Sequence, residues 1–175
     1  MSPPPELLPP LHVFRFQVDF KEDPLGAKEP TDSAVPLCVG SFAECGGIEA
    51  SMEPKEIKEG GRNYGSIQRA GRTTFSTVML KRGMTSTRHL WTWFELMNAR
   101  GAYAYRLAAT ITLCDNAGRG VIAWTLRHAL PVKLKVADLN ARGTDVGIEE
   151  LHIAHESLEE STSSLLSIPN ESRAG

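Results

Sequence analysis

The sequence has little of what marks several common protein classes. Its 175 residues include only three cysteines, Cys38, Cys45 and Cys114, an odd number without a CxxC pair or other zinc-type spacing. This argues against a disulfide framework and predicts free thiols in a reducing cytoplasm. Lysine and arginine number 19 against 21 acidic residues, so the net charge of -2 gives no overall attraction to nucleic acid or anionic membranes.

Long apolar runs are also missing. No stretch approaches the ~20 apolar residues that span a bilayer, so we expect no membrane insertion. The N-terminus, MSPPPELLPPLH, lacks the basic start and uninterrupted apolar run of a secretion signal. Its prolines predict a flexible, extended arm over residues 1–11. The chain length favours one buried core rather than two.

Motifs for catalysis or cofactor binding are not found. No serine lies in a GxSxG turn, and Gly60-Gly61 does not fit a phosphate-binding loop. His152, His155 and Glu156 suggest a metal set, but three-residue spacing on a strand points the two imidazoles to opposite faces. We therefore expect no enzyme activity, no catalytic residue, no metal site and no cofactor.

The chain instead shows the two-residue periodicity of β-strands. Alternating apolar and polar residues predict strands over 12–20, 38–52, 72–82, 103–113, 120–128 and 145–158. Pro131 interrupts the alternation, which Val132, Leu134 and Val136 resume as expected for an edge or a kinked continuation. A bend is expected at Gly46 and Gly47. A bulge is expected at Glu149 and Glu150, where the apolar residues change parity.

One segment has helical spacing. Leu90, Trp91, Phe94 and Met97 recur at helical intervals and predict a helix over about 87–99, whose aromatic residues pack into the core rather than bind a ligand. Beyond residue 158 the chain is serine-rich, which predicts a disordered tail over 159–175.

The strands predicted over 103–113 and 120–128 share a face of small and polar residues. Small and polar residues alternate there with aliphatic ones, and the set is Ala108, Thr110, Thr112, Ala123, Thr125 and Arg127. The alternation therefore predicts one aliphatic face and one small polar face for both strands.

The segment 53–72, EPKEIKEGGRNYGSIQRAGR, is too long for a simple hairpin, which needs two to five residues. It carries five basic residues against three acidic ones, whereas residues 149–160 carry five glutamates and no lysine or arginine. We interpret 53–72 as an interaction arm. Its acidic counterpart in another subunit would be Glu149, Glu150 and Glu156. The alternative is that both regions are ordinary solvated surfaces.

Taken in order, these segments resemble the tail-tube proteins of contractile phages and phage-tail-like injection systems, related in fold to the type VI secretion tube protein Hcp. The matching stretches are FRFQVDF, KEGGRNYGSIQRAGR, LKRGMT, LWTWFELMNARG, WTLRHALPVK and DVGIEELHIAHESL. Together they cover residues 12–158.

The resemblance implies a mainly β fold, a small antiparallel β-barrel or sandwich with one flanking α-helix. It implies a single domain over 12–158 between the N-terminal arm and the C-terminal tail. Such proteins are structural: they form stacked hexameric rings that enclose a lumen. Their long loop reaches the neighbouring ring, and here the ring-stacking positions are Lys55, Glu56, Lys58, Gly60, Gly61, Arg62, Asn63 and Tyr64.

A lumen must let cargo slide, so the resemblance implies that it is lined by the small polar face described above, with Ala108, Thr110, Thr112, Ala123, Thr125 and Arg127. The alternative is that this face is the outer, solvated face of an ordinary sandwich.

The partners implied are other copies of the chain in a homohexamer, a sheath protein, spike or baseplate and tube-terminator proteins, and a payload in the lumen. No sequence-specific nucleic acid is implied. Assembly would be cytoplasmic, within a phage-tail-like particle that is extracellular or membrane-docked in some systems. One alternative is a baseplate-proximal initiator ring that docks the tube on the spike. Another, of a different class, is a monomeric ligand-binding β-barrel.

Overall fold

The computed structural model describes residues 11–13, 15–26, 28–31, 42–57, 65–98 and 103–162. The proline-rich arm predicted before residue 11, most of the tail predicted from residue 159, and the segment 58–64 lie outside these ranges.

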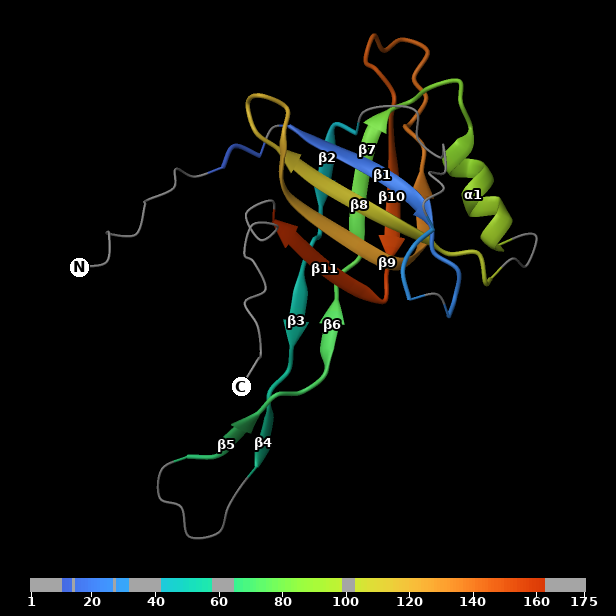
Figure 1. The fold of residues 1–175 in the computed structure, drawn as a ribbon. Helices are drawn as coiled ribbons and strands as arrows, with labels where there is room; N and C mark the ends of the chain where they lie inside the picture. Colours follow the sequence, from blue (N-terminus) through green and yellow to red (C-terminus); the bar gives the residue numbers. More distant parts are fainter. Residues whose placement is uncertain are drawn as a thin grey trace.

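Antiparallel strands make up most of the described chain, and Figure 1 shows their arrangement. The elements are β1 (Phe16–Glu22), β2 (Glu44–Gly46), β3 (Ala50–Met52), β4 (Lys55–Ile57), β5 (Ile67–Arg69), β6 (Thr73–Phe75), β7 (Val78–Gly83), α1 (His89–Asn98), β8 (Leu107–Cys114), β9 (Gly120–Lys135), β10 (Ile148–Ala154) and β11 (Ser157–Thr162). Seven strands form one sheet in the order β1-β8-β9-β10-β7-β2, with β11 also paired to β9. The ladders β3-β6 and β4-β5 stand apart from it.

Strand β9 belongs to two layers. Its first half pairs with β8 and β11, and its second half, from Leu130 to Lys135, pairs with β10. The sheet therefore bends along β9 into one layer made of β1, β8, β9 and β11 and another made of β9, β10, β7 and β2 (Figure 1). This two-layered arrangement lets the alternating apolar faces of both layers meet.

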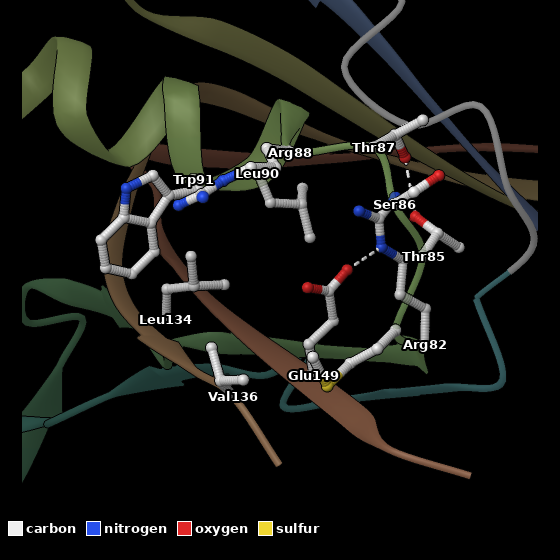
Figure 2. Close-up of a pocket in the computed structure, with 11 residues that line it drawn as sticks. Arg82, Thr85, Ser86, Thr87, Arg88, Leu90, Trp91, Leu134, Val136 and Glu149 are labelled. Carbon is white, nitrogen blue, oxygen red and sulfur yellow. Dashed lines mark hydrogen bonds and ion pairs between the residues drawn. The ribbon is translucent and has the colours of Figure 1, made fainter. Parts of the chain in front are cut away.

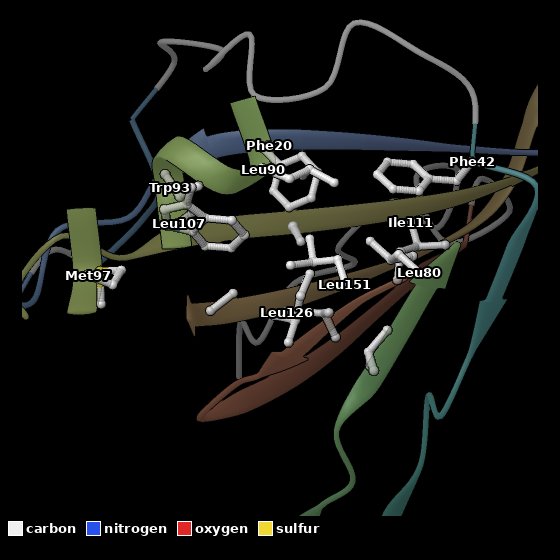
Figure 3. Packing of buried hydrophobic residues seen from close by; sticks show 14 residues of the cluster. Phe20, Phe42, Leu80, Leu90, Trp93, Met97, Leu107, Ile111, Leu126 and Leu151 are labelled. Carbon is white, nitrogen blue, oxygen red and sulfur yellow. The ribbon is translucent and has the colours of Figure 1, made fainter. Parts of the chain in front are cut away.

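The core lies between these layers and α1. Fully buried side chains include Leu80 from β7, Leu107 from β8, Leu126 from β9 and Leu151 from β10 (Figure 3). Burying a Leu, Ile or Phe side chain stabilises a fold by about 1.5–3 kcal/mol, so a cluster of this kind is the main source of stability.

Helix α1 closes one side of the core. It buries Leu90, Trp93 and Met97, which follow the helical spacing of the sequence. The Trp93 indole meets Phe20 of β1 edge to face, with ring centroids 5.8 Å apart. Trp91 points away and is 36% exposed. The helix predicted over about 87–99 is confirmed, with its core-packing face.

A buried ion pair fixes the bend in β9. The register between β8 and β9 shifts between Leu107 and Ala109, which places an extra residue in β9 around His128. His128 has φ of 50°, in the left-handed region. Its backbone N–H donates to Asp23 at 2.7 Å, and Arg127 donates to the same carboxylate from Nε at 3.1 Å and Nη2 at 2.9 Å.

The fold-class prediction is confirmed in that the chain is mainly β, antiparallel and carries one helix among the described residues. The described strands form an open, sandwich-like arrangement rather than a closed barrel. The predicted bend near Gly47 is also confirmed, because this glycine has φ of 83° and ends the pairing of β2 with β7. A Cβ there would lie 2.4 Å from the carbonyl oxygen of Thr77.

Other predictions placed the ends of strands wrongly. The segment 72–82 is two strands, β6 and β7. The alternation after Pro131 continues the strand before it, as expected, but Pro131 does not interrupt β9. The segment 145–158 divides into β10 and β11, and the irregularity in β10 falls between His152 and Ile153 rather than at Glu149. The predicted domain boundary at Leu158 falls inside β11.

Replacing Asp23 with Asn tests whether its ion pair with Arg127 stabilises the bend in β9. Burial alone would raise the pKa of the Asp23 carboxyl, but the hydrogen bonds from Arg127 and His128 and the charge of Arg127 outweigh it and lower the pKa. Leaving Arg127 without this carboxylate should reduce the free energy of unfolding by about 3 kcal/mol at pH 7, measured by urea denaturation.

The same pair predicts a pH dependence. A lowered pKa means that the carboxylate stabilises the fold above its unfolded pKa of about 3.9 and that this stabilisation is lost as pH falls through the folded pKa. The stability difference between wild type and Asp23→Asn should therefore shrink below about pH 4. The control, Asp19→Asn at an exposed position of β1, should change stability by less than about 0.5 kcal/mol. Equal losses for the two variants would contradict the role of the ion pair.

Candidate functional site

Residues 50–57 and 65–75 form a long two-stranded ribbon that leaves the body of the protein (Figure 1). Ala50 to Met52 pair with Thr73 to Phe75, and Lys55 to Ile57 pair with Ile67 to Arg69. Most of its side chains are exposed. A two-stranded ribbon is only marginally stable alone in water, so a projecting one suits a contact with another surface. We call this ribbon the arm.

The arm has a tight crossing between its two ladders. The backbone of Gly71 passes so close to Glu53 that a Cβ would lie 1.7 Å from the Glu53 carbonyl oxygen. Glycine at position 71 is therefore required by backbone contact. In the outer ladder, formed by β4 and β5, the side-chain amide of Gln68 donates to the Glu56 carboxylate at 3.2 Å.

Of the predicted ring-stacking residues, Lys55 and Glu56 lie in β4 with exposed side chains. The other six, at positions 58 and 60–64, fall outside the described residues. Their role in stacking stays a prediction.

The predicted lumen residues lie on one face of the β1-β8-β9-β11 layer. Thr110 is opposite Thr125, with their hydroxyl oxygens 3.3 Å apart, and Thr112 is opposite Ala123. The other face of the layer carries the core residues, such as Ile111. Outer strands extend the polar face with Gln17, Asp19, Lys21, Ser157, Glu159 and Ser161.

Two members of the predicted set are less accessible than the rest. Ala108 and Arg127 are 2% and 7% exposed. The Arg127 guanidinium is engaged by Asp23 and also donates to the backbone carbonyl of Lys28 at 3.1 Å. Arg127 therefore lies on the polar face but acts as a structural group within the chain.

The polar layer has two open edges within the described part of the chain. Strand β1 pairs only with β8, and β11 pairs only with β9. The backbone N–H of Cys114 donates to the Arg15 carbonyl, and the backbone N–H of Asp23 donates to the Arg106 carbonyl. The backbone N–H and C=O groups of the odd-numbered residues of β1 therefore point toward β8. The N–H groups of Phe16, Val18 and Phe20 then point to the open edge. An unprotected edge is a template for pairing with another strand.

The predicted acidic counterpart is divided between two places. Glu149 is an ion-pair partner of buried Arg82, and Glu150 lies 3.7 Å from His152. Glu156 lies 3.4 Å from His128 at the bend, after β10 has run the length of the body. These glutamates do not form one continuous acidic surface.

The described residues contain no group of three or more potential ligands that could hold a metal ion. Cys45 and Cys114 are free, and burial raises the pKa of the Cys45 thiol to about 11, which keeps it protonated at neutral pH. Cys38 lies outside the described ranges. Where helix is described, it is too short or too polar to cross a membrane.

Comparison with known proteins identifies the family of this chain. The sequence model of the family described as "T4-like virus tail tube protein gp19" matches residues 12–159. The chain belongs to this tail tube family. It is therefore a structural protein of the tail-tube type, and its resemblance to the family is confirmed. A comparison with curated proteins found no match.

Solved structures agree in fold. A chain of the anti-feeding prophage baseplate, from a 6-fold symmetrised structure, is 24% identical with a TM-score of 0.71, over 89% of this tail tube protein and 98% of that chain. A chain of the sheath-tube complex of an extracellular contractile injection system is 19% identical with a TM-score of 0.66, over 87% and 92%. A type six secretion system protein is 10% identical with a TM-score of 0.50, over 83% of each chain.

Sequence reasoning missed the two buried arginine pairs. Arg82 follows Val78 and Leu80 on the buried face of β7, so the alternation itself placed a charge in the interior of the tail tube protein. That signal called for an acidic partner, and Glu149 is directly opposite Arg82 in the register of β10 and β7. Asp23 had no comparable signal, because it follows β1 in a loop.

Replacing Gly71 with Ala should disturb the arm and leave the body intact. The added methyl group forces the crossing apart, so amides of β4 and β5 should lose protection in hydrogen exchange. The urea midpoint followed by tryptophan fluorescence should stay unchanged, because Trp91, Trp93 and Trp124 lie in the body and not in the arm. Gly46→Ala is the matched control, because its Cβ would meet no atom closer than Met79 Cε at 3.9 Å. If the amides of β4 and β5 keep their hydrogen-exchange protection in Gly71→Ala, the backbone at the crossing accommodates the methyl group and glycine is not required there.

Proposed function

We propose that this protein is the inner-tube subunit of a contractile injection system or phage tail, and that its copies close into hexameric rings that stack into a tube. The observation that carries this proposal is a four-stranded antiparallel layer with one apolar face, one polar face and two open edges. Family membership supplies the structural role, and the layer suggests how copies join.

Ring closure follows from strand direction. Strands alternate from β1 through β8 and β9 to β11, so β1 and β11 run in opposite directions. When β11 of one copy lies beside β1 of the next, the junction is antiparallel like every other pair in the layer. A ring closed in this way leaves no open edge, which removes the risk of uncontrolled pairing. The 6-fold symmetrised baseplate of the related prophage supports a ring of six.

The polar face would line the lumen. Its centre is formed by small side chains such as Thr110, Thr112 and Ala123, which offer no large apolar surface to a passing payload. Its charges occur in both signs, with Lys21 near Glu159 around a shallow hollow of about 320 Å³. The apolar face is already buried against β7, β10 and α1, so it could not line a channel.

The arm would join successive rings. It leaves the body beyond the edge of the layer and exposes most of its side chains (Figure 1). Head-to-tail stacking makes each arm reach the next ring, which gives heterologous contacts that extend along an axis. Sheath, baseplate or spike, terminator and payload are then the expected partners, in a phage-tail-like particle assembled in the cytoplasm.

A second candidate is an initiator ring that docks the tube on the spike. The match to a baseplate chain of the anti-feeding prophage favours it as an alternative. The product of assembly separates the two candidates, since a main tube subunit forms long tubes and an initiator forms single rings. Negative-stain microscopy of the purified protein distinguishes these outcomes, and a monomer at high concentration would reject both.

Proline at position 18 tests ring closure through β1. The Val18 N–H points to the open edge, so Val18→Pro keeps the β1-β8 ladder but removes a donor needed by a neighbouring strand. We expect Val18→Pro to remain monomeric by light scattering.

Val18→Ala is the matched control, because it loses similar core packing and keeps the N–H. It should form rings like the wild type, and the two variants should have similar thermal stability. Rings formed equally well by Val18→Pro would reject edge pairing at β1.

Charge reversal tests the role of the arm. Replacing Lys55, Lys58 and Arg62 with Glu should block stacking and leave single rings, because these are three of the five basic residues in segment 53–72 and charge reversal would oppose an acidic partner. Electron microscopy would show rings without tubes. The charge-conserving variant Lys55→Arg, Lys58→Arg, Arg62→Lys is the matched control and should form tubes like the wild type. If the arm variant forms normal tubes, the arm does not make the stacking contact.

A further inference from the structure

A cavity of about 400 Å³ lies where the N-terminus of α1 meets the ends of β7, β9 and β10 (Figure 2). Its apolar wall is formed by Leu90, Trp91, Leu134 and Val136, and its polar wall by Arg82, Ser86 and Glu149. Figure 2 shows the Arg82 guanidinium between the Glu149 carboxylate and Ser86. We call this space the α1 cavity.

Arg82 has donors that the described part of the chain does not satisfy. Its side chain is 2% exposed, and its Nε donates to Glu149, but Nη1 and Nη2 are buried without a hydrogen-bond partner. A buried guanidinium normally uses its whole fork of N–H groups, and unmet donors cost free energy. An acceptor entering the α1 cavity would relieve that cost.

The surroundings favour an anionic acceptor. The first turn of α1 has no acidic residue, so the positive end of the helix dipole is not balanced within the helix. Arg88 stacks over Trp91 with its guanidinium carbon 5.8 Å from the ring centroid. Arg82 and Arg88 outnumber the single carboxylate of Glu149 in the cavity lining. A carboxylate from another chain fits this balance.

The cavity and the arm are at opposite ends of the body. Strand β7 leads from the arm at Val78 to Arg82 and Gly83 beside the cavity, and Figure 1 shows the arm and the start of α1 pointing to opposite sides. Head-to-tail stacking therefore brings the arm of one copy to the cavity end of the next. The eight residues from Ala50 to Ile57 extend about 25 Å, more than the length of β7, so the arm can reach past the face of the adjacent ring.

We infer that the α1 cavity is the acceptor for the arm of the axially adjacent copy, and that Arg82 binds an arm carboxylate. This inference rests on the stacked-ring function proposed above. We choose Glu59 because in the sequence it comes two residues after Ile57, the last residue of β4. The Glu56 carboxylate already accepts a hydrogen bond from Gln68 within the arm.

Neighbouring charges support the same contact. The segment 136–150 beside the cavity carries Asp138, Asp145, Glu149 and Glu150 against Arg142. These carboxylates can receive the basic residues of the arm, so the mixed charges of the two surfaces complement each other.

Glu156 cannot serve as this acceptor in head-to-tail stacking. Its neighbour His155 lies against Phe75 at the base of the arm, with ring centroids 5.3 Å apart. Glu156 is therefore at the arm's own end of the body. Of the three glutamates in the predicted acidic counterpart, only Glu149 and Glu150 can take part in this contact.

Cysteine crosslinking in the full chain tests the placement. Lys58→Cys is combined with Ser86→Cys, an exposed residue at the cavity, and oxidised after assembly. The inference expects a ladder of covalent multimers on non-reducing gels. Lys58→Cys combined with Glu156→Cys should give no ladder beyond that of the single-cysteine variants, which measure the background from Cys38, Cys45 and Cys114.

The outcomes separate this inference from the proposed function. Tubes that crosslink through position 156 and not through position 86 would overturn the cavity as acceptor while leaving the tube function intact. Failure of the wild-type chain to form rings or tubes would overturn both.

Glu59→Gln tests the carboxylate itself. It should reduce the number and length of tubes and leave rings unchanged, whereas the matched control Glu56→Gln should form tubes like the wild type. If Glu59→Gln tubes were as abundant and long as the wild type, the contact between Arg82 and Glu59 would be rejected. Glu56 is exposed in β4, so its replacement removes no core packing.

Discussion

The sharing of β9 between two layers is the constraint on which the rest of the structure depends. A strand of 16 residues cannot remain straight and pair with β8 and β11 at one end and β10 at the other. The chain bends at His128, where the backbone has a positive φ. Asp23 stabilises that conformation by accepting from the His128 backbone and from the neighbouring Arg127. Without this bend the apolar faces of the two layers would not meet.

The bend also separates the tasks of the two layers. The layer of β1, β8, β9 and β11 keeps one face polar and its edges open, because its apolar face is covered by β7, β10 and α1. The second layer supplies the base of the arm through β7 and β2, and β7 carries Arg82 to the far end. One strand therefore connects the proposed stacking element to its proposed acceptor. Lateral and axial contacts can arise from different parts of one small core.

Much of this was readable from residue alternation. Ile111 and Leu113 alternate with Thr110 and Thr112, and that pattern correctly assigned the core and polar faces of β8. Leu90 and Met97 at helical spacing correctly gave α1. Alternation could not show that Ser76 and Thr77 interrupt a strand, because polar β-branched and hydroxyl residues are equally compatible with pairing. It also placed Arg127 on the right face without revealing that Asp23 holds it there.

The sequence by itself determined the mainly β class, the single helix, the polar face and the existence of an arm, because periodicity and glycine positions are local properties of the chain. Tertiary structure alone decided which edges are open, where the glutamates lie and which charges are paired. Glu149 and Glu156 are seven residues apart yet belong to opposite ends of the body, because β10 runs its full length between them. Arg82 was visible as a charge on a buried face. Only the packing of β7 against β10 and α1 shows that its Nε meets Glu149 while its Nη groups are left free beside a cavity.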